Sequence, residues 1–371
     1  MPAKMATRNI TDLDTPAVIV DLKIMQANLK RMAQYCRQYG LSLRPHTKTH
    51  KIPELARMQL SLGAHGITVA KLGEAEIMHA AGIDDILIAY PICGAIKLKR
   101  LAQLAQTAGI TVAFDSLEVA QGLSSAARTG RCEIGAMVEA DVGYHRCGIA
   151  SGKDLIELCQ RVASLPGLTF KGVMIYPGHI WGDAENRRSR SLEVGERVAT
   201  IAAMLKQNGF ENYQISGGST PSAYFSHLMP EVTEIRPGTY IFNDMNTCSL
   251  GAARIEECAA SVRVSVISTA VDGQIVIDGG SKTFSSDRLL SGDGHGFGFI
   301  REAPEARFLH MNEEHGLIDV RQCKRHFRIG ESLTIIPNHV CATINMHEVV
   351  YGIEDDSVCD QFRVAARGKV C

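Results

Sequence analysis

Apolar runs of strand length alternate with amphipathic segments between about residues 41 and 244. In the amphipathic segment GAIKLKRLAQLAQTAG, for example, Ile96, Leu98, Leu101, Leu104 and Ala105 recur on one side of a helix. This alternation is typical of repeated βα units around a parallel sheet. Eight apolar runs are predicted to be the strands of that sheet, at residues 41–47, 66–70, 85–91, 110–115, 133–141, 168–178, 211–218 and 231–244.

Eight βα units close naturally into a TIM-type (β/α)8 barrel. A doubly wound sheet is the competing architecture, but no GxGxxG motif follows the first predicted strand. After about residue 258 the pattern changes to β-rich stretches such as SVRVSVISTAV and GQIVIDGG, which predict a second, all-β domain. The strand-like segment TPAVIVDL is expected to pair with that domain. We therefore predict a barrel over residues 24–258 and a β domain formed by 1–23 and 259–371.

Charge and composition exclude some partners. Lys and Arg number 39 against 40 Asp and Glu, so the chain lacks the excess of positive charge that binding to nucleic acid requires. No segment supplies the roughly 18 consecutive apolar residues of a membrane span, and the N-terminal segment lacks the apolar core of a signal peptide. We therefore expect a cytoplasmic protein without nucleic-acid or membrane partners. Most of the 11 cysteines are expected to be reduced packing residues.

Barrel active sites form at the C-terminal ends of the strands, so reactive residues there are the first candidates. The first predicted strand ends in LRPHTKTHK, which places Lys48 beside His46, His50 and Lys51. Partial burial and cationic neighbours at the barrel mouth would favour the neutral amine that forms imines. The alternative interpretation of Lys48 is an exposed loop lysine.

The seventh predicted strand runs into SGGSTPSAYF. Here Gly217 and Gly218 would let the backbone approach an anion, and Ser219 and Thr220 would add hydroxyls at the start of a helix. A phosphate site commonly follows strands seven and eight of a barrel. The same residues would also serve as a plain helix N-cap with a tight turn.

The fifth and sixth predicted strands carry polar residues at their ends. EADVGYHRCG places His145 and Arg146 there, and MIYPGH places Tyr176 and His179 at the same end of the barrel. The alternatives are an ordinary ion pair of Arg146 with Asp141 or Glu139 and rim packing for Tyr176.

In the predicted β domain, IPNHVCATINMHE places His339 and Cys341 two residues apart. In an extended strand, such a pair points to one face. An imidazole and a thiolate together suit zinc or a similar metal, and they would leave positions open for water or substrate. A buried cysteine beside a histidine satisfied by hydrogen bonds is the alternative interpretation.

Taken together, these segments resemble the fold-type III pyridoxal-phosphate enzymes that comprise D-serine dehydratase, D-threo-3-hydroxyaspartate dehydratase and D-threonine aldolase. The resemblance extends over nearly the whole chain. The matching segments, in the family's order, are DTPAVIVDL, LRPHTKTHK, GITVAKLGEAE, EADVGYHRCG, SGGSTPS, RPGTYIFND, EEHG and PNHVCAT.

The resemblance implies an alanine-racemase-like barrel plus β domain, commonly assembled as a homodimer. It implies that Lys48 is the Schiff-base lysine of pyridoxal 5'-phosphate, with Arg146 near the pyridine nitrogen and Tyr176 near the ring. The residues that it places around the phosphate are Gly218, Ser219, Thr220 and Tyr240. It also implies that His339 and Cys341 bind a divalent metal, for which zinc is our first expectation and manganese, cobalt and magnesium are alternatives.

The implied activity is that of a lyase acting on D-β-hydroxy amino acids, with Lys48 as the base. The HxC pair and the GSTP segment resemble the dehydratases, which favours conversion of D-serine or D-threo-3-hydroxyaspartate to a 2-oxo acid and ammonia. The following INMHE resembles the aldolases, so cleavage to glycine and an aldehyde, with His179 as a candidate base, is the alternative. A racemase would not need HxC, and a non-catalytic cofactor carrier would lack the β tail.

Overall fold

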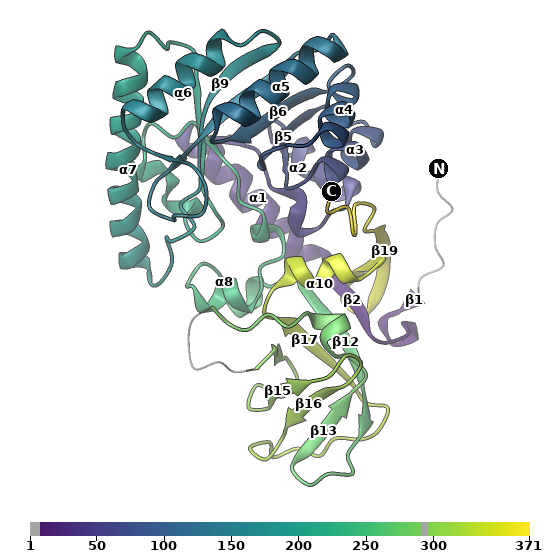
Figure 1. Ribbon diagram of the computed structural model, residues 1–371. Coiled ribbons are helices and arrows are strands. Elements are labelled where there is room, and N and C mark those ends of the chain that lie inside the picture. The colour runs from purple at the N-terminus through teal and green to yellow at the C-terminus, as the bar shows by residue number, and fades with distance from the viewer. Residues whose placement is uncertain (1–7, 291–295) are drawn as a thin grey trace. The chain divides into compact units, whose positions relative to one another are not determined.

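The computed structural model describes residues 8–290 and 296–371, and these form two compact units (Figure 1). The unit that we call the β unit comprises the described residues up to Lys30, together with Thr49–Ile52 and Thr239–Gly368. The barrel unit comprises Arg31–Lys48, Pro53–Gly238 and Lys369–Cys371. Compactness alone does not define a cofactor-binding domain, so the bounds 24–258 stay a prediction.

Eight parallel strands form the barrel unit, in the order β3-β11-β10-β9-β7-β6-β5-β4. The two ends of this order meet through a parallel bridge between His46 and Thr68 and a hydrogen bond from Thr68 N to Pro45 O of 2.9 Å. Each strand overlaps one of the eight predicted apolar runs, which confirms the predicted (β/α)8 barrel. The strands are β3 (Ser42–Leu43), β4 (Ile67–Val69), β5 (Asp85–Ile88), β6 (Gly109–Phe114), β7 (Ile134–Asp141), β9 (Leu168–Ile175), β10 (Gln214–Gly217) and β11 (Glu234–Ile235), with a short β8 (Ile149–Ala150) beside β7.

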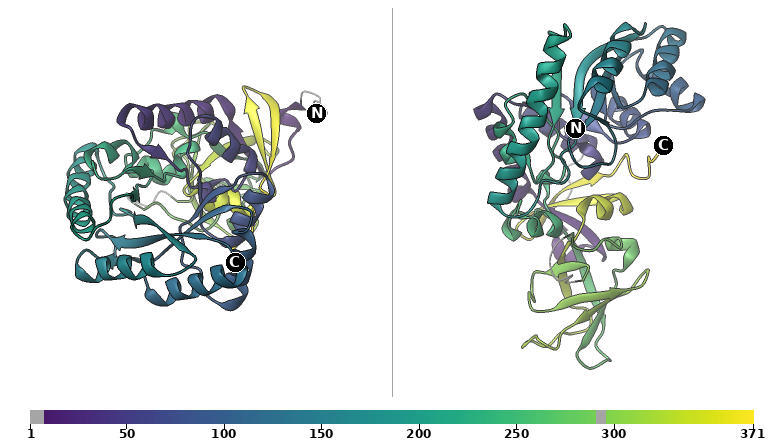
Figure 2. Two further views of the ribbon diagram at one scale, coloured as in Figure 1. Left: turned by 90° about the horizontal axis from the view of Figure 1, so that it is seen from above. Right: turned by 60° about the vertical axis from the view of Figure 1, so that its left-hand side comes forward.

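Helices lie outside the barrel strands, as the left view of Figure 2 shows for the blue and teal segments. They are α2 (Pro53–Ser61), α3 (Leu72–Ala80), α4 (Ala95–Leu104), α5 (Leu117–Gly130), α6 (Lys153–Ser164) and α7 (Ala184–Gln207), and α1 (Leu22–Tyr39) spans the division between the units. Burial follows the helical period, so that α6 buries Leu155, Leu158, Cys159 and Val162. The prediction that Ile96 lies on the apolar side of α4 is wrong, because this residue of the first turn is 78% exposed.

The β unit is built mainly from antiparallel strands, in the order β1-β19-β18-β2-β12-β13-β16-β15, with β17 paired to β12 and β14. As predicted, the strand within TPAVIVDL, β2, pairs with β12. The strands are β1 (Arg8–Asn9), β2 (Ala17–Asp21), β12 (Ala260–Ser268), β13 (Gln274–Ile277), β14 (Gly298–Ile300), β15 (Arg307–Met311), β16 (Gly316–Asp319), β17 (Ser332–Pro337), β18 (Val349–Glu354) and β19 (Ser357–Arg363).

The second domain is mostly sheet, as predicted, but two short helices interrupt its strands, α9 (Ser281–Phe284) and α10 (Val340–Met346). A third, α8 (Met245–Ser249), precedes β12. Helices of four to seven residues are too short to produce a recognisable hydrophobic period. None of the helices in the described part of the chain combines the length and hydropathy that a membrane crossing requires.

Candidate active site

A cavity of about 370 Å³ lies in the barrel unit at the C-terminal ends of the strands. Four residues predicted from the sequence line it, namely Lys48, Arg146, Tyr176 and Gly218. Further lining residues include His46, Tyr90, Glu139 and Arg236. The structure therefore brings together side chains that follow five different strands, which is the usual construction of an active site on a barrel.

Lys48 lies in the 3-10 turn η2 (Thr47–Thr49) that follows β3. The turn is fixed by Thr47, whose Oγ1 donates to Thr68 O at 3.1 Å, and by a bond from Lys48 N to His46 Nδ1 at 3.4 Å. Lys48 is partly buried and lines the cavity. This position disfavours the interpretation as an exposed loop lysine.

The prediction that cationic side chains flank Lys48 is wrong for His46. Burial lowers the pKa of His46 well below its ordinary value, and Lys48, Arg236 and Arg146 lower it further, so this imidazole is neutral. His50 and Lys51 belong to the β unit, where His50 Nδ1 accepts from Ile52 N at 3.0 Å and Lys51 Nζ donates to Asn345 Oδ1 at 2.7 Å.

Arg146 lies over an aromatic ring at the cavity wall. Its guanidinium carbon is 4.3 Å from the ring centroid of Tyr176, and the nearest Glu139 oxygen is 4.0 Å from its nitrogen. Burial raises the pKa of Glu139, and Arg146 and Arg236 oppose this. Asp141 is not the partner of Arg146, because its carboxylate accepts from the backbone of residues 143–145 and lies 2.6 Å from His145 Nδ1.

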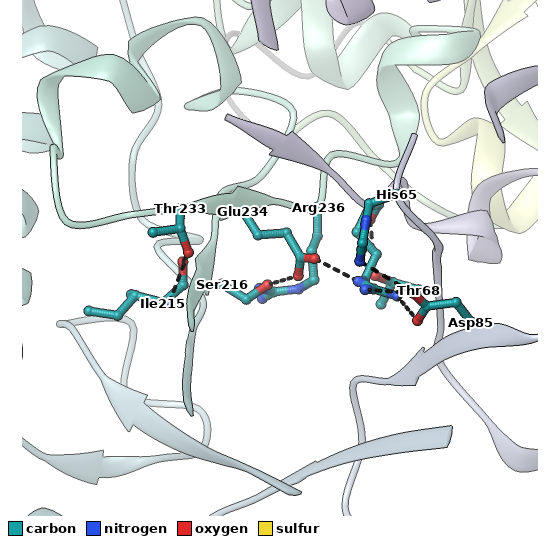
Figure 3. A network of polar contacts seen from close by, with 9 residues as sticks. His65, Thr68, Asp85, Ile215, Ser216, Thr233, Glu234 and Arg236 are labelled. Carbon is teal, nitrogen blue, oxygen red and sulfur yellow. Dashed lines mark hydrogen bonds and ion pairs between the residues drawn. The ribbon is translucent and has the colours of Figure 1, made fainter. Parts of the chain in front are cut away.

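Arg236 was missed by the analysis of the sequence. It follows β11 and is 5% exposed, and its Nη1 donates to Ser216 Oγ at 2.6 Å (Figure 3). Its Nη2 donates to Ile175 O at 2.8 Å. A basic residue at the end of the eighth predicted run was the available signal. This signal is hidden when residues 231–244 are predicted to form one continuous strand.

The glycine pair after β10 permits close approach of the backbone. Gly218 has φ +86°, and a Cβ there would lie 3.2 Å from Ile235 Cβ. The next residues, Ser219 and Thr220, are buried. Ser219 N donates to Ser222 Oγ at 3.0 Å, so the loop also serves as a tight turn. The helix expected to start at Ser219 and Thr220 is instead the 3-10 helix η3 (Ala223–Leu228).

His179 is not among the described residues that line the cavity. A Cβ on Gly143 would lie 3.4 Å from its Cε1, and its Nδ1 has no hydrogen-bond partner in the described part of the chain. Burial lowers the pKa of His179, and Arg190 and Arg197 lower it further. The structure therefore places a neutral imidazole beside the loop after β7.

His339 and Cys341 lie in the β unit, but not in one strand. Strand β17 ends at Pro337, His339 has φ −133° and ψ 97°, and Cys341 lies in the first turn of α10. Their side chains nevertheless interact, since Cys341 raises the pKa of His339. The Cys341 Sγ also donates to Thr49 Oγ1 at 3.3 Å and lies 3.8 Å from Thr239 Oγ1.

Asp244 is a second residue that the analysis of the sequence missed. It is buried, and its Oδ2 accepts from Val340 N at 3.0 Å. Burial opposes protonation of His339, but Cys341, Asp244 and Asp287 together raise the pKa of His339 to about 9. An adjacent imidazole and sulfur, with a buried carboxylate nearby, form a donor set that suits a divalent cation.

The polar residues that follow the HxC pair lie in the β unit, as does Tyr240. Within residues 8–290 and 296–371, no group of three or more His, Cys, Asp or Glu side chains is placed to hold a metal. His347 Nε2 is 3.1 Å from Thr283 O, and Glu348 binds Arg367 at 2.8 Å. Tyr240 lies buried in η4 (Thr239–Ile241) of the β unit.

Comparison with known proteins gives matches over both parts of the chain. Residues 20–246 match the family described as "Alanine racemase, N-terminal domain", and residues 259–353 match "Putative serine dehydratase domain". D-threonine aldolase of Arthrobacter sp. is 32% identical over 96% of this chain and 93% of that protein.

Solved structures agree with these matches. The crystal structure of D-threonine aldolase from Filomicrobium marinum has a TM-score of 0.91 at 32% identity and covers 100% of both chains. D-threo-3-hydroxyaspartate dehydratase from Delftia sp. HT23 has a TM-score of 0.88 at 30% identity, covering 96% of this chain and 98% of that one. A cysteine-to-alanine mutant of a D-threo-3-hydroxyaspartate dehydratase has been solved in a metal-free form.

Proposed function

Because the chain belongs to the family of fold-type III pyridoxal-phosphate enzymes that comprises D-serine dehydratase, D-threo-3-hydroxyaspartate dehydratase and D-threonine aldolase, we propose that it is a metal-activated lyase of D-β-hydroxy amino acids. The family and the alanine-racemase-like fold agree with the predictions from sequence. The observation that carries the proposal is the cavity that Lys48, Arg146, Tyr176 and Gly218 line together.

The cavity suits pyridoxal 5'-phosphate in size and charge. Its volume of about 370 Å³ is within the range of small-molecule sites. Lys48, Arg146 and Arg236 face a single lining carboxylate, Glu139, so the charge balance favours an anion. We propose that Lys48 would hold the cofactor through its amine, that Arg146 would lie near the pyridine nitrogen and that Tyr176 would lie near the ring.

The phosphate of the cofactor is assigned to the loop after β10. We propose that the backbone at Gly218 and the hydroxyls of Ser219 and Thr220 bind it, with Tyr240 as a further contact. The absence of a Cβ at Gly218 and its positive φ support a close approach of the backbone to an anion. The Ser219–Ser222 hydrogen bond keeps the loop in one conformation.

The chemistry divides between groups that the chain supplies and groups that it binds. When bound, pyridoxal 5'-phosphate supplies a ring that accepts electrons and so acidifies the Cα–H of the amino acid. The Lys48 amine, once released from the cofactor, takes that proton onto Nζ. A divalent metal held by His339 and Cys341 would supply polarisation of the β-hydroxyl oxygen.

Dehydration of D-serine or D-threo-3-hydroxyaspartate to a 2-oxo acid and ammonia is our main proposal, because HxC and GSTP both resemble the dehydratases. The likeness to D-threonine aldolases over the whole chain favours a second candidate, cleavage to glycine and an aldehyde. His179, with its pKa lowered by burial, Arg190 and Arg197, is the proposed base in that case. A match to a serine dehydratase domain over 259–353 argues against a cofactor carrier.

Product analysis separates these activities. The purified protein, loaded with pyridoxal 5'-phosphate, is offered D-serine, D-threonine and D-3-hydroxyaspartate with and without a chelator, and the L-enantiomers are the controls. Oxo acid and ammonia are the expected products, whereas glycine and aldehyde would establish the aldolase. Activity that is insensitive to the chelator would remove the metal from the proposal.

The identity of the metal, the oligomeric state and the cellular location remain to be proposed. We propose zinc as the metal, because an imidazole and a thiolate are ligands that zinc prefers, with manganese, cobalt and magnesium as alternatives. We propose a homodimer, as the family resemblance implies, and a cytoplasmic location. Elemental analysis of the purified protein and its mass in solution test the first two.

A further inference from the structure

Charged side chains occupy the interior of the barrel, where branched apolar residues are usual. Arg44, Glu234 and Arg236 are between 1% and 7% exposed, and Ser216 between them is fully buried. Burying charges costs free energy that well-packed apolar side chains would not require. Such a cluster therefore points to a function beyond stability.

The four side chains form one continuous chain of contacts with Asp85 (Figure 3). Arg236 Nη1 donates to Ser216 Oγ at 2.6 Å, and Ser216 Oγ donates to Glu234 Oε1 at 2.6 Å. The other Glu234 oxygen accepts from Arg44 Nε at 2.7 Å, and Arg44 Nη1 lies 2.6 Å from Asp85 Oδ1. Ser216 thus connects Arg236 to its nearest buried carboxylate.

This series of side-chain contacts lies between two cavities of the barrel unit. Arg236 lines the cavity of about 370 Å³ at the C-terminal ends of the strands. Glu234, Arg44 and Asp85 line another, of about 790 Å³, which includes residues at the N-terminal ends of the strands such as Gly109 and Gln214. Glu234 begins β11 and Arg236 follows its last residue, so the two side chains are two positions apart in extended backbone and share one side of it.

We propose that Glu234 and Ser216 are positioning residues that hold the guanidinium of Arg236 as a fixed cation in the floor of the cofactor cavity. This inference rests on the proposed function, because it assumes that the cavity holds pyridoxal 5'-phosphate. Arg236 reaches the cofactor, whereas Glu234 and Ser216 act through it.

The charges around Arg236 support this arrangement. Burial lowers the pKa of Arg236 to about 10, and of the neighbours that oppose burial Glu234 acts most strongly, before Glu139. Arg44 lowers the pKa further, and Tyr176 raises it. Glu234 therefore contributes most to keeping this guanidinium charged.

Two variants and one control test the proposal. Glu234→Gln removes the charge but keeps the side-chain shape, and Ser216→Ala removes one oxygen and breaks the connection to Arg236. The matched control is Asp85→Asn, which makes the same carboxylate-to-amide change on the other side of Arg44. Its side chain is 48% exposed, and it is absent from the charges that act on Arg236.

The first measurement uses cofactor-free protein. Phenylglyoxal reacts with the neutral guanidine, and mass spectrometry measures the rate at Arg236. Every unit by which the pKa of Arg236 falls raises its neutral fraction about tenfold. We therefore expect modification at least about threefold faster in Glu234→Gln and Ser216→Ala, at equal thermal stability, and an unchanged rate in Asp85→Asn.

The second measurement uses the loaded enzyme. In Ser216→Ala and Glu234→Gln we expect the visible absorption band of the cofactor to shift and kcat to fall about tenfold or more, while KM changes less than about threefold. Wild-type rates and spectra in both variants, or equal damage in Asp85→Asn, would overturn the proposal. If Glu234→Gln does not fold, Ser216→Ala decides. A further outcome is that the wild-type protein binds no cofactor while phenylglyoxal still modifies Arg236 faster only in these two variants. In that case the positioning role of Glu234 and Ser216 stands and the proposed function fails.

Discussion

The pKa values of two histidines are shifted in opposite directions by their surroundings. His46 is neutral because burial and then Lys48, Arg236 and Arg146 lower its pKa. His339 has its pKa raised to about 9, since Cys341 and the carboxylates of Asp244 and Asp287 outweigh burial. At the scale of single residues, therefore, the charged neighbours that folding brings close determine which proton an imidazole keeps.

The neutral His46 predicts a pH dependence of stability. In the unfolded chain its pKa returns to about 6.5, so the unfolded state binds more protons than the folded state below that pH. Stability then falls as the pH drops from about 6.5 towards the lower folded-state pKa, by at most about 1.4 kcal/mol per pH unit. We expect His46→Asn to unfold with a smaller loss between pH 7 and pH 5 than the wild type.

Urea unfolding at several pH values measures this loss. His310→Asn, which removes an exposed imidazole, is the control. A pH slope for His46→Asn as steep as that of the wild type would show that His46 does not titrate as described.

Asp244 predicts a change in metal binding without loss of the HxC pair. Asp244→Asn keeps a side-chain oxygen for Val340 N but removes the negative charge beside His339. Substitution of such supporting groups typically weakens metal binding about 10- to 100-fold. The metal concentration for half-maximal activity should rise accordingly, while Asp360→Asn, at an exposed carboxylate of the same unit, leaves it unchanged. Equal values for the two variants would exclude this role.

At the scale of elements, the loop after β10 depends on a glycine for two separable reasons. Gly218 has φ +86°, and its missing Cβ leaves room for Ile235. Gly209 has φ +82° but open space around it. A left-handed φ costs an L-residue about 1–2 kcal/mol.

We therefore expect Gly209→Ala to lose about this amount of unfolding free energy, and Gly218→Ala to lose more and also to bind pyridoxal 5'-phosphate more weakly. Unfolding and cofactor titration measure the two effects. Cofactor affinity equal to that of the wild type in Gly218→Ala would contradict the assignment of this loop to the phosphate.

The strands were predictable because each buried barrel strand forms a short apolar run between turn residues. The ends of these strands were less predictable. The run at 231–244 contains only the two-residue β11, because Pro237 and Gly238 interrupt it and the chain then enters the β unit. The pair at His339 and Cys341 was placed in a strand because a seven-residue helix leaves too few positions to reveal its period.

At the scale of the whole molecule, the change in sequence texture after residue 258 indicated a second unit, and the structure has one that is mostly sheet. The sequence pattern does not reveal that Thr49–Ile52, directly after Lys48, belongs to that unit. Residues such as Arg236 and Asp244 were missed for a related reason. Their surroundings consist of groups far apart in the sequence, such as Ser216 for Arg236 and Val340 for Asp244.

The central claim is that Lys48 holds the cofactor. Borohydride reduction of the enzyme loaded with pyridoxal 5'-phosphate, followed by mass spectrometry of its peptides, tests it directly. The account predicts the added mass of the reduced cofactor on Lys48, none on Lys51 three residues later, and none anywhere in Lys48→Ala. Label on another lysine of the wild type, or undiminished labelling of Lys48→Ala, would contradict it.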